Sequence, residues 1–360
     1  MVPSRHLSSS LAVVLSLRRI NVFLAALGFA ASAAAAPPLH KAAPPGSGYE
    51  KRPDVRAFVD EMVAEHHFKR RDLLAVMAQA RYQPKIVAAM QRPYLEPPKW
   101  YDYLPQFLTP QRIDGGVEFA RRNAAALARA QQEYGVPPEI IVAIIGVETL
   151  YGRNVGSHRV IDALTTLAFD YPRRASFFRG ELKEFLLFAR DQQISPLEPK
   201  GSFAGAIGVP QFMPGSVRRF AVDFDGNGHI DLWGSEEDAI GSVANYLVRH
   251  DWQRGQPVLL PAALTDEARD NVLRKLDGGL SERRALGAWN VDGVAALGLP
   301  EDLSPDPVGL LQLEESAAGE ASYWIACPNF YVITRYNKSS LYAAAVWRLS
   351  EMIRATSAPR

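Results

Sequence analysis

The segment IIVAIIGVETLYG, from Ile140 to Gly152, places a single carboxylate, Glu148, next to a long apolar run. Helical spacing puts Ile144 and Ile145 one turn before Glu148 and Tyr151 one turn after it, on the same face. Burial against hydrocarbon and the negative end of the helix dipole both disfavour the charged carboxylate, so its pKa should be raised. A carboxyl group that keeps its proton near neutral pH suits general acid catalysis. We therefore predict that Glu148 is a catalytic acid, with an exposed helix-end glutamate as the alternative interpretation.

A second group of oxygen-bearing side chains lies in the segment DFDGNGHID, which begins at Asp223. Asp223, Asp225 and Asn227 occupy loop positions 1, 3 and 5, a glycine follows at position 6, and His229 offers its carbonyl at position 7. Alternating side chains on such a turn direct their oxygens at one hard cation, so we predict a calcium-binding loop. A polar turn that happens to be acidic is the alternative.

The twelfth position of this loop departs from the usual pattern, because Gly234 replaces the expected bidentate glutamate. The missing carboxylate would have to come from Glu236, Glu237 or Asp238 at the start of the next helix. Asp238 also lies three residues after Ser235, which is the spacing of a capping box. We expect a structural site that binds calcium more weakly than a sensor does.

Two further segments combine polar side chains with residues that restrict the backbone. GSFAGAIGVPQFMPG, from Gly201 to Gly215, carries Ser202 and Gln211 among glycines and prolines that let a ligand approach the backbone closely. A tight turn packed between helices explains this segment equally well. In YPRR, Arg173 and Arg174 would suit an acidic group of a substrate, although arginines at a helix start are often only solvated.

The segment RYNKSS places Tyr336 and Asn337 at an expected junction between a strand and the last helix. Ser339 or Ser340 would cap that helix, so turn chemistry is the simpler interpretation of this segment. A role in ligand binding is the alternative.

The elements that must position these residues are mostly helices, as the spacing of apolar residues indicates. Prolines at 137–138 and a glycine at 152 delimit the helix that carries Glu148. Other helices are expected over 54–91, 115–135, 171–192, 235–252 and 339–353, an extended connection over 92–107, and strands over 256–262, 307–315 and 322–336. The pattern predicts a mainly α chain of the α+β class, with a small β-containing part late in the sequence.

The first 36 residues have the features of an export signal. Basic residues up to Arg19 precede the apolar stretch INVFLAALGFAASAAAA, whose small residues suit cleavage near Ala34 to Ala36. A retained membrane anchor is the alternative, but the apolar stretch is short for a membrane span. Cys327 is the only cysteine, so there is no intramolecular disulfide and no lipid-accepting cysteine near the signal. We expect a bacterial periplasmic protein in which Cys327 is buried.

The composition allows a large core and argues against nucleic acid as a partner. Of the 360 residues, 48% are hydrophobic, and 40 lysine and arginine residues against 39 acidic ones give a formal net charge of +1. A nucleic-acid-binding protein would be expected to carry a clear basic excess. The length favours about two lobes.

Together, these motifs resemble the membrane-bound lytic transglycosylase B family of bacterial murein-cleaving enzymes. The resemblance rests on YGVPPEIIVAIIGVETLYG, IDALTTLAFDYPRRASFF, GSFAGAIGVPQFMPGS, AVDFDGNGHIDLWGSEEDAIGSVANYL and VITRYNKSS, which occur in this order. It spans the chain from about residue 58 to the C-terminus. The organisation we expect is a signal peptide (1–36), a flexible leader (37–53), a helical N-terminal lobe (54–114), a lysozyme-like catalytic core (115–260) with an EF-hand-like loop (223–238), a small mixed α/β lobe (261–320), and a C-terminal strand and helix that close the groove (321–360).

The resemblance also implies roles for individual residues. Glu148, in the GVET motif, would be the single catalytic acid and base, and Asp238 would complete a structural calcium site with the loop at Asp223. One extra residue between Trp233 and Asp238 departs from the family pattern at that site. The residues implied to line the glycan groove are Ser202, Gln211, Tyr246, Tyr336, Asn337 and Tyr342.

The implied substrate is the glycan strand of peptidoglycan, cut between N-acetylmuramic acid and N-acetylglucosamine. Most glycosidases use two carboxylates, whereas this sequence offers one in an apolar setting. That difference favours lytic cleavage to a 1,6-anhydromuramyl end, without a catalytic cofactor. A water-using muramidase and a non-catalytic, calcium-stabilised murein-binding protein remain as alternatives. The expected partners are glycan strands and, as candidates, other cell-wall enzymes, and we expect the chain to be a monomer.

Overall fold

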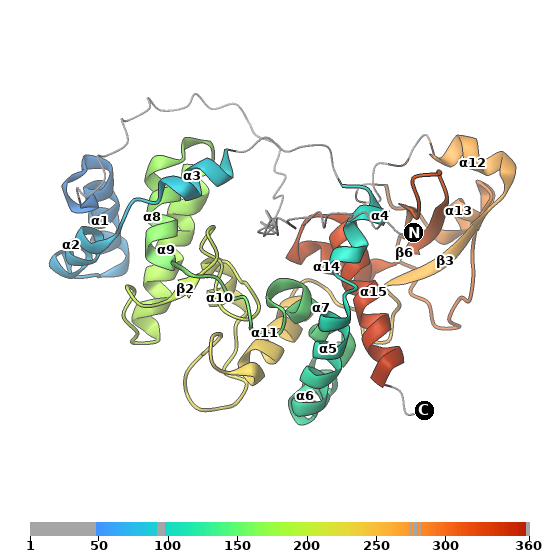
Figure 1. Ribbon diagram of the computed structural model, residues 1–360, viewed down its shortest axis with the longest axis horizontal. Helices are drawn as coiled ribbons and strands as arrows, with labels where there is room; N and C mark the ends of the chain where they lie inside the picture. Colours follow the sequence, from blue (N-terminus) through green and yellow to red (C-terminus); the bar gives the residue numbers. More distant parts are fainter. Residues whose placement is uncertain (1–47, 92–97, 274–275, 277–279, 281, 358–360) are drawn as a thin grey trace, which may run out of the picture.

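The computed structural model describes residues 48–91, 98–273, 276, 280 and 282–357 (Figure 1). The predicted signal peptide and most of the predicted leader lie outside the described residues. Within the described part, no helix combines the length and the apolar character that crossing a bilayer requires.

Helices make up most of the described chain, and a small antiparallel sheet forms late in the sequence, so the predicted mainly α class is confirmed. The α-helices are α1 (Pro53–His66), α2 (Arg70–Gln79), α3 (Pro84–Met90), α4 (Trp100–Tyr103), α5 (Pro110–Arg122), α6 (Ala124–Tyr134), α7 (Pro138–Thr149), α8 (Val160–Asp170), α9 (Ala175–Asp191), α10 (Pro214–Phe220), α11 (Glu236–Val248), α12 (Asp266–Leu273), α13 (Leu286–Val291), α14 (Pro328–Tyr336) and α15 (Ser340–Ser357). Short 3₁₀ turns are η1 (Tyr49–Lys51), η2 (Leu104–Gln106) and η3 (Pro172–Arg174). The strands are β1 (His158–Arg159), β2 (Lys200–Gly201), β3 (Leu259–Leu264), β4 (Val294–Ala296), β5 (Gly309–Glu314) and β6 (Ala321–Ala326).

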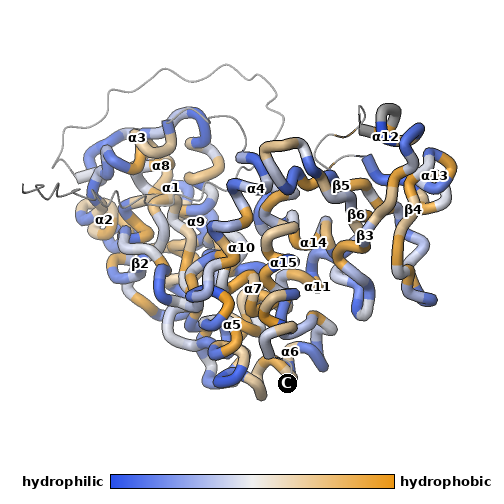
Figure 2. The backbone as a smooth tube through the Cα atoms, turned by 45° about the vertical axis from the view of Figure 1, so that its right-hand side comes forward, coloured by the Kyte–Doolittle hydropathy of each residue, from blue (hydrophilic) through white to orange (hydrophobic). Residues whose placement is uncertain are grey.

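Helix α7 lies at the centre of the molecule, where α5, α6, α11 and α15 pack against it (Figure 1). Every residue from Ile140 to Val147 is buried, so the helix is apolar on all sides rather than on one, and it forms a hydrophobic stretch of the tube in Figure 2. The helix ends at Thr149 rather than at Gly152, because Leu150 and Tyr151 already have left-handed φ angles of 52° and 61°. Tyr151 therefore leaves the helix and does not follow Glu148 along its face.

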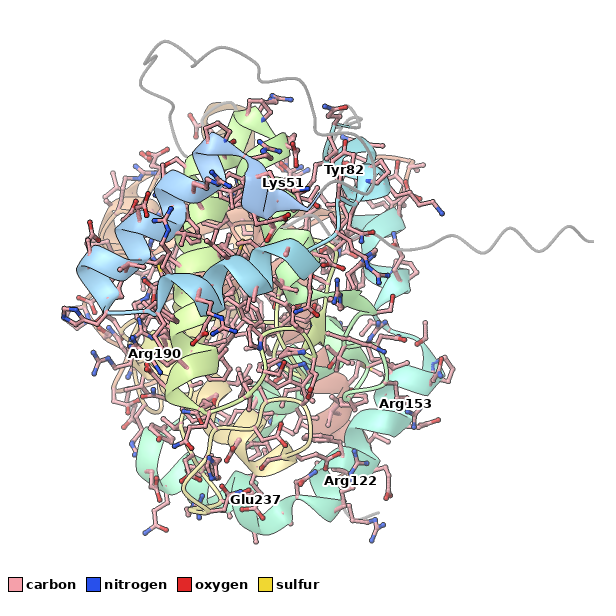
Figure 3. The ribbon with its side chains drawn as sticks, turned by 90° about the vertical axis from the view of Figure 1, so that its left-hand side faces the viewer. Lys51, Tyr82, Arg122, Arg153, Arg190 and Glu237 are labelled. Carbon is pink, nitrogen blue, oxygen red and sulfur yellow. The ribbon has the colours of Figure 1, made fainter. Side chains whose placement is uncertain are left out.

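Helices α8 and α9 form a close pair to one side of α7, at the left in Figure 1. The N-terminal helices α1 and α2 lie on the outer side of this pair, as the view from that side shows (Figure 3). Helix α3 contacts α8, and α10 contacts α9. This group of helices forms one flank of the molecule.

Two predicted elements differ from the structure in the first half of the chain. The single helix predicted over 115–135 is two helices, α5 and α6, that meet at Asn123. The side chain of Asn123 donates hydrogen bonds to the carbonyl of Phe119 (3.0 Å) and to Glu236 (2.6 Å). Such local bonds let an asparagine interrupt a helix. The connection predicted as extended over 92–107 contains α4 and η2 in its described part.

The strand predicted over 322–336 is also wrong in its second half. It ends before Cys327, which is buried as predicted, and Pro328 begins α14. Proline suits the first turn of a helix, and packing against the core overrides the strand preference of the aromatic and β-branched residues that follow. Tyr336 is consequently the last residue of α14, and Asn337 lies between two helices and not between a strand and a helix.

The strands β3 to β6 form an antiparallel sheet in the order β4-β3-β6-β5, at the right in Figure 1. Leu260 and Leu310 both pair with Ile325, and together with Trp289 of α13 they belong to a small core separate from the main one. The other face of the sheet contributes Leu311 to the main core. The sheet is therefore packed on both faces and is attached to the helical body.

Candidate active site

Glu148 lies in the last turn of α7 and is partly buried, with Ile144 and Ile145 fully buried one turn before it. The hydroxyl of Tyr342, at the start of α15, donates a hydrogen bond of 2.6 Å to Oε1 of Glu148. Burial raises the pKa of Glu148 from 4.5 to about 7, and the hydrogen bond from Tyr342 opposes part of that increase. Glu148 therefore exchanges its proton near neutral pH.

Three tyrosines lie beside this carboxyl group. Tyr342 is 1% exposed, and burial raises its pKa well above the usual value, as it does for Tyr336, with the charge of Glu148 adding to both shifts. Tyr336 donates a hydrogen bond to the carbonyl of Pro210 (2.7 Å), and the rings of Tyr336 and Tyr246 pack edge to face with centroids 4.9 Å apart. These phenols stay protonated and act as hydrogen-bond donors of fixed orientation.

The segment 201–215 forms a compact loop next to the tyrosines. Oγ of Ser202 accepts hydrogen bonds from the N–H groups of Ala204 (3.3 Å) and Ala206 (3.0 Å). Nε2 of Gln211 donates to the carbonyls of Val155 (3.1 Å) and Gly208 (2.8 Å). Both side chains are partly exposed, and among the described residues Oε1 of Gln211 has no hydrogen-bond donor. The turn chemistry suggested by the sequence is present, and both residues remain partly exposed.

The remaining predicted groove residues, Asn337, Arg173 and Arg174, make no hydrogen bond or ring contact with Glu148 in the described part of the chain. Asn337 follows the last residue of α14, and its carbonyl accepts a hydrogen bond of 2.7 Å from the N–H of Ser339, in the turn that leads into α15. Arg174 lies over the ring of Phe177 at 4.3 Å, and burial lowers its pKa, whereas Arg173 is exposed. Among the described residues, no hydrogen bond or ring contact joins either arginine to Glu148.

Tyr103 of α4 is a candidate site residue that the sequence reasoning missed. Its hydroxyl lies close enough to Tyr342 to contribute to the raised pKa of that residue, and its ring packs against Phe107 with centroids 4.9 Å apart. The segment WYDYLPQF contains it, and that concentration of aromatic residues was the available signal. The helix α4 brings Tyr103 to the site from the connection that had been expected to be extended.

The loop that begins at Asp223 has the hydrogen bonds of a calcium-binding turn. Oδ1 of Asp223 accepts from the N–H groups of Gly226 (2.8 Å) and Asn227 (3.0 Å), and Oδ2 accepts from Gly228 (2.8 Å). Desolvation opposes ionisation of Asp223, but these backbone donors outweigh it and lower the pKa. Oδ1 of Asn227 accepts from the N–H of His229 at 2.9 Å, so successive side chains fold inward along the loop.

Asp238 is the acid at the start of α11 that reaches this loop. It is fully buried, its Oδ1 accepts from the N–H groups of Phe224 (2.7 Å) and Asp225 (3.1 Å), and its Oδ2 accepts from Asp231 (2.8 Å). Carboxylate oxygens of Asp223, Asp225 and Asp238 all lie within 4.8 Å of one another. Three carboxylates so close together fit a hard divalent cation, which would offset their mutual repulsion.

The two neighbouring acids point elsewhere. Glu236 pairs with Arg122 at 2.7 Å, and Glu237 is exposed at the rim of the molecule in Figure 3. Oγ of Ser235 accepts from the N–H of Asp238 at 3.1 Å, which caps α11, but the carboxylate of Asp238 does not return to Ser235 as a full capping box would require. The side chain of Asp238 is thus directed into the loop.

Comparison with known protein families gives a match over most of the chain. The family model described as "Transglycosylase SLT domain" matches residues 50–351. The membrane-bound lytic murein transglycosylase B of Escherichia coli (strain K12) is 43% identical over 331 residues, which cover 88% of this chain and 87% of the relative.

Several solved structures share the fold. The soluble lytic transglycosylase SltB1 of Pseudomonas aeruginosa is 46% identical, with a TM-score of 0.79, over 85% of this chain and 100% of that one. The Escherichia coli lytic transglycosylase Slt35 in complex with calcium is 42% identical, with a TM-score of 0.78, over 87% and 96%. SltB3 of Pseudomonas aeruginosa in complex with NAG-anhNAM-pentapeptide is 31% identical, with a TM-score of 0.73, over 86% and 80%.

Proposed function

The chain belongs to the transglycosylase SLT domain family of lytic murein transglycosylases, and we propose that it uses Glu148, first as an acid and then as a base, to cut glycan strands. The bond cut lies between N-acetylmuramic acid and N-acetylglucosamine of peptidoglycan. The observation that carries this assignment is the carboxyl group of Glu148, whose pKa burial raises to about 7 at the end of a buried helix. A group with that pKa holds a proton to give and can take one back at neutral pH.

In the first step, protonated Glu148 gives its proton to the glycosidic oxygen, and the bond from that oxygen to C1 of the muramyl residue breaks. The oxocarbenium-like centre at C1 is stabilised by the acetamido group of the same sugar. The hydrogen bond from Tyr342 strengthens as Glu148 becomes negative, because a donor binds a carboxylate more tightly than a carboxylic acid.

In the second step, the Glu148 carboxylate removes the proton from the C6 hydroxyl of the muramyl residue, and that oxygen bonds to C1. The product is a 1,6-anhydromuramyl end, no water is consumed, and Glu148 regains its proton. The packed surroundings of Glu148 favour this route, since they limit competing water. The solved complex of the relative SltB3 with NAG-anhNAM-pentapeptide supports such a product for this chain.

A water-using muramidase would need a second carboxylate about 5 to 10 Å from the first. Burial and the hydrogen bond from Tyr342 account for the shifted pKa of Glu148, and no other carboxylate of the described residues contributes to that shift. Glu181 is half-buried and its pKa is also raised by burial, but its carboxylate accepts from the N–H of Gly215 at 2.7 Å and is influenced by Arg219 and Arg174 instead. This arrangement favours the lytic route over hydrolysis.

The test is product analysis of purified murein sacculi treated with the wild-type chain and with Glu148→Gln. Mass spectrometry should find 1,6-anhydromuramyl ends from the wild type, and the variant should release no soluble fragments. Reducing muramyl ends would instead establish a hydrolase, and full activity of Glu148→Gln would refute the assignment of this residue.

Folding of Glu148→Gln is the necessary control. The pKa of Glu148 is about 7 in the folded chain and 4.5 in the reference state, so ionisation costs folded-state stability progressively between pH 4.5 and pH 7. Glutamine removes that cost, so the variant should melt no lower than the wild type at pH 8. An inactive variant that melts normally separates lost chemistry from lost folding.

The same proposal includes a structural calcium ion. Asp223, Asp225, Asn227, the carbonyl of His229 and Asp238 would hold it, and the relative Slt35 has been solved in complex with calcium. Bound calcium would neutralise the clustered carboxylates and stabilise the loop. The residues of the catalytic step lie on other elements, so the ion has no assigned part in proton transfer.

The proposed substrate and the N-terminal sequence both indicate the same cellular location. Peptidoglycan lies outside the cytoplasmic membrane, and the predicted signal peptide (1–36) would direct the chain there. The related Escherichia coli protein is named as membrane-bound, whereas this sequence has no cysteine near its signal for lipid attachment. The proposed location is the periplasm, detectable by fractionation of cells that carry the full-length chain.

A further inference from the structure

Thr149, the residue after Glu148, is 1% exposed and uses its hydroxyl to join two parts of the site. Oγ1 accepts a hydrogen bond from the N–H of Gly152 (3.0 Å) and donates to the carbonyl of Val209 at 2.9 Å. The carbonyl of Ile145 is farther away, at 3.3 Å. A hydroxyl has one proton to donate, so the bond to Val209 is the main one. It links the end of α7 to a loop 60 residues later in the sequence.

The loop is held from several sides at the point where Thr149 meets it. The N–H of Val209 donates to the carbonyl of Leu232 at 2.8 Å, and the carbonyl of Pro210 accepts from Tyr336 at 2.7 Å. Gln211 follows with a left-handed φ of 53°, a conformation that persists in a non-glycine residue only when its surroundings impose it. Of the hydrogen bonds that hold this loop, the one from Thr149 comes from the residue next to Glu148.

The turn that follows α7, at Leu150 and Tyr151, is also held by several contacts. Leu150 and Tyr151 are both left-handed, and the hydroxyl of Tyr151 donates to the carbonyl of Arg112 in α5 at 2.6 Å. The ring of Tyr151 folds back over Gly146, where a Cβ would lie 2.5 Å from the Tyr151 hydroxyl oxygen. Thr149 also binds the N–H of Gly152 at the end of this turn, so one hydroxyl fixes the turn and the loop together.

We propose that Thr149 is a positioning residue: its hydroxyl sets the distance between the carboxyl group of Glu148 and the loop that carries Ser202 and Gln211. The inference rests on the proposed function, in which Glu148 transfers the proton and the loop binds the glycan. Displacing a reacting group by about 1 Å can lower a rate by up to about a hundredfold, so loss of this link should reduce turnover.

The test compares three substitutions at this position. Thr149→Val keeps the shape but leaves the carbonyl of Val209 and the N–H of Gly152 without their partner, and it should lower kcat about tenfold or more. Thr149→Ser keeps the hydroxyl and should retain kcat within about threefold, even if loss of the methyl group lowers Tm. Thr149→Ala leaves room for a water molecule to satisfy both groups and provides a folded variant should Thr149→Val not fold. It should also lose turnover, because water does not hold the distance.

Thr166→Val is the matched control for stability. Thr166 is likewise fully buried, and its Oγ1 accepts a hydrogen bond of 3.0 Å from the N–H of Gln83, in the flank formed by α3 and α8. The same chemical change there should lower Tm and leave kcat unchanged. All assays use the full chain well below the lowest Tm, with a soluble glycan fragment as substrate.

Two readouts separate positioning from general loss of structure. In Thr149→Val, kcat should fall more than KM rises, and the pH at which activity declines should stay near that of the wild type, because Tyr342 and the burial of Glu148 are unchanged. Turnover of Thr149→Val and Thr149→Ala equal to that of Thr166→Val would overturn the inference. So would a decline in the activity of Thr149→Val moved to lower pH, which would show that the burial of Glu148 itself had changed. An active Glu148→Gln would instead refute the proposed function itself.

Discussion

At the scale of single residues, the site depends on one carboxyl group whose charge is disfavoured by its surroundings and then stabilised by one donor. Burial raises the pKa of Glu148 to about 7, and Tyr342 reduces that effect through a hydrogen bond of 2.6 Å. The balance suits a group that must be protonated before bond cleavage and negative after it. Activity should therefore decline as the pH rises through about 7, where the acid form is lost.

Removing the hydroxyl of Tyr342 tests this balance. In Tyr342→Phe the donor that favours the carboxylate is gone, so the pKa of Glu148 should rise and the decline in activity should move to higher pH. We expect kcat to fall about tenfold, since the charged form loses one hydrogen bond. The measurement is a pH profile of kcat/KM.

Tyr49→Phe is the control, because Tyr49 is also buried and donates to a carboxylate, that of Asp170, at 2.7 Å in another part of the molecule. It should leave the profile unchanged. A profile for Tyr342→Phe that stays in place or moves to lower pH would contradict the role given to this hydrogen bond.

At the scale of elements, the loop at Asp223 and the helix α11 together form the proposed cation site. The loop supplies Asp223 and Asp225, and the first turn of α11 supplies Asp238, so neither element is complete alone. The same loop leads to Leu232, whose carbonyl binds the N–H of Val209. A cation bound there would thus stabilise a connection that supports the loop carrying Val209.

Calcium should raise Tm by several degrees, because an ion at about one hundred times its Kd contributes about 2.7 kcal/mol to the free energy of unfolding. For each variant, the increase is the Tm measured with calcium minus the Tm of the same variant measured with chelator. Asp238→Ala should abolish it, and Glu237→Ala, which alters an exposed neighbouring acid, should retain it. Cleavage at moderate temperature should continue without calcium. An identical Tm with calcium and with chelator would rule out the site.

At the scale of the whole molecule, a buried ionic contact attaches the N-terminal helices to the rest. Arg52, just before α1, pairs with Asp170 at the end of α8 at 2.6 Å, with their side chains 12% and 3% exposed. Tyr49 donates to the other oxygen of Asp170, and Arg52 also binds the carbonyl of Phe169 at 2.9 Å. These bonds span more than one hundred residues of sequence and fix the outer helices of Figure 3 on the α8–α9 pair.

Asp170→Asn should loosen the attachment of those helices, because it weakens the buried pair and leaves Arg52 with Asp54, at 2.6 Å, as its remaining carboxylate partner, at a cost of about 2 kcal/mol. Hydrogen exchange should become faster in α1 and α2, while cleavage by the folded enzyme is retained, since Glu148 lies on a different element. Glu118→Gln disrupts an exposed pair with Arg121 and should leave stability nearly unchanged. Equal exchange in both variants would contradict this account.

The sequence by itself determined the features that depend on neighbouring residues. An apolar run of helical spacing predicted that Glu148 would sit at the end of a buried helix, and the spacing from Asp223 to Asn227 predicted a turn that the structure contains. Prediction from local sequence was wrong where tertiary packing outweighs the strand preference of individual residues. An example is the helix that begins at Pro328 within a stretch of strand-forming residues. The helix predicted over 115–135 is interrupted at Asn123 for a similar reason, because the side chain of Asn123 donates a hydrogen bond to Glu236, which is distant in the sequence.

Only the tertiary structure decided which distant side chains complete each site. Tyr342 lies 194 residues from Glu148, Val209 lies 60 from Thr149, and these separations carry no periodic signal. Likewise, the choice of Asp238 over its acidic neighbours depended on the direction in which α11 leaves the loop. The physical reason is that helix and turn patterns report bonds within a few residues, whereas a proton donor meets its acceptor only after the whole core has packed.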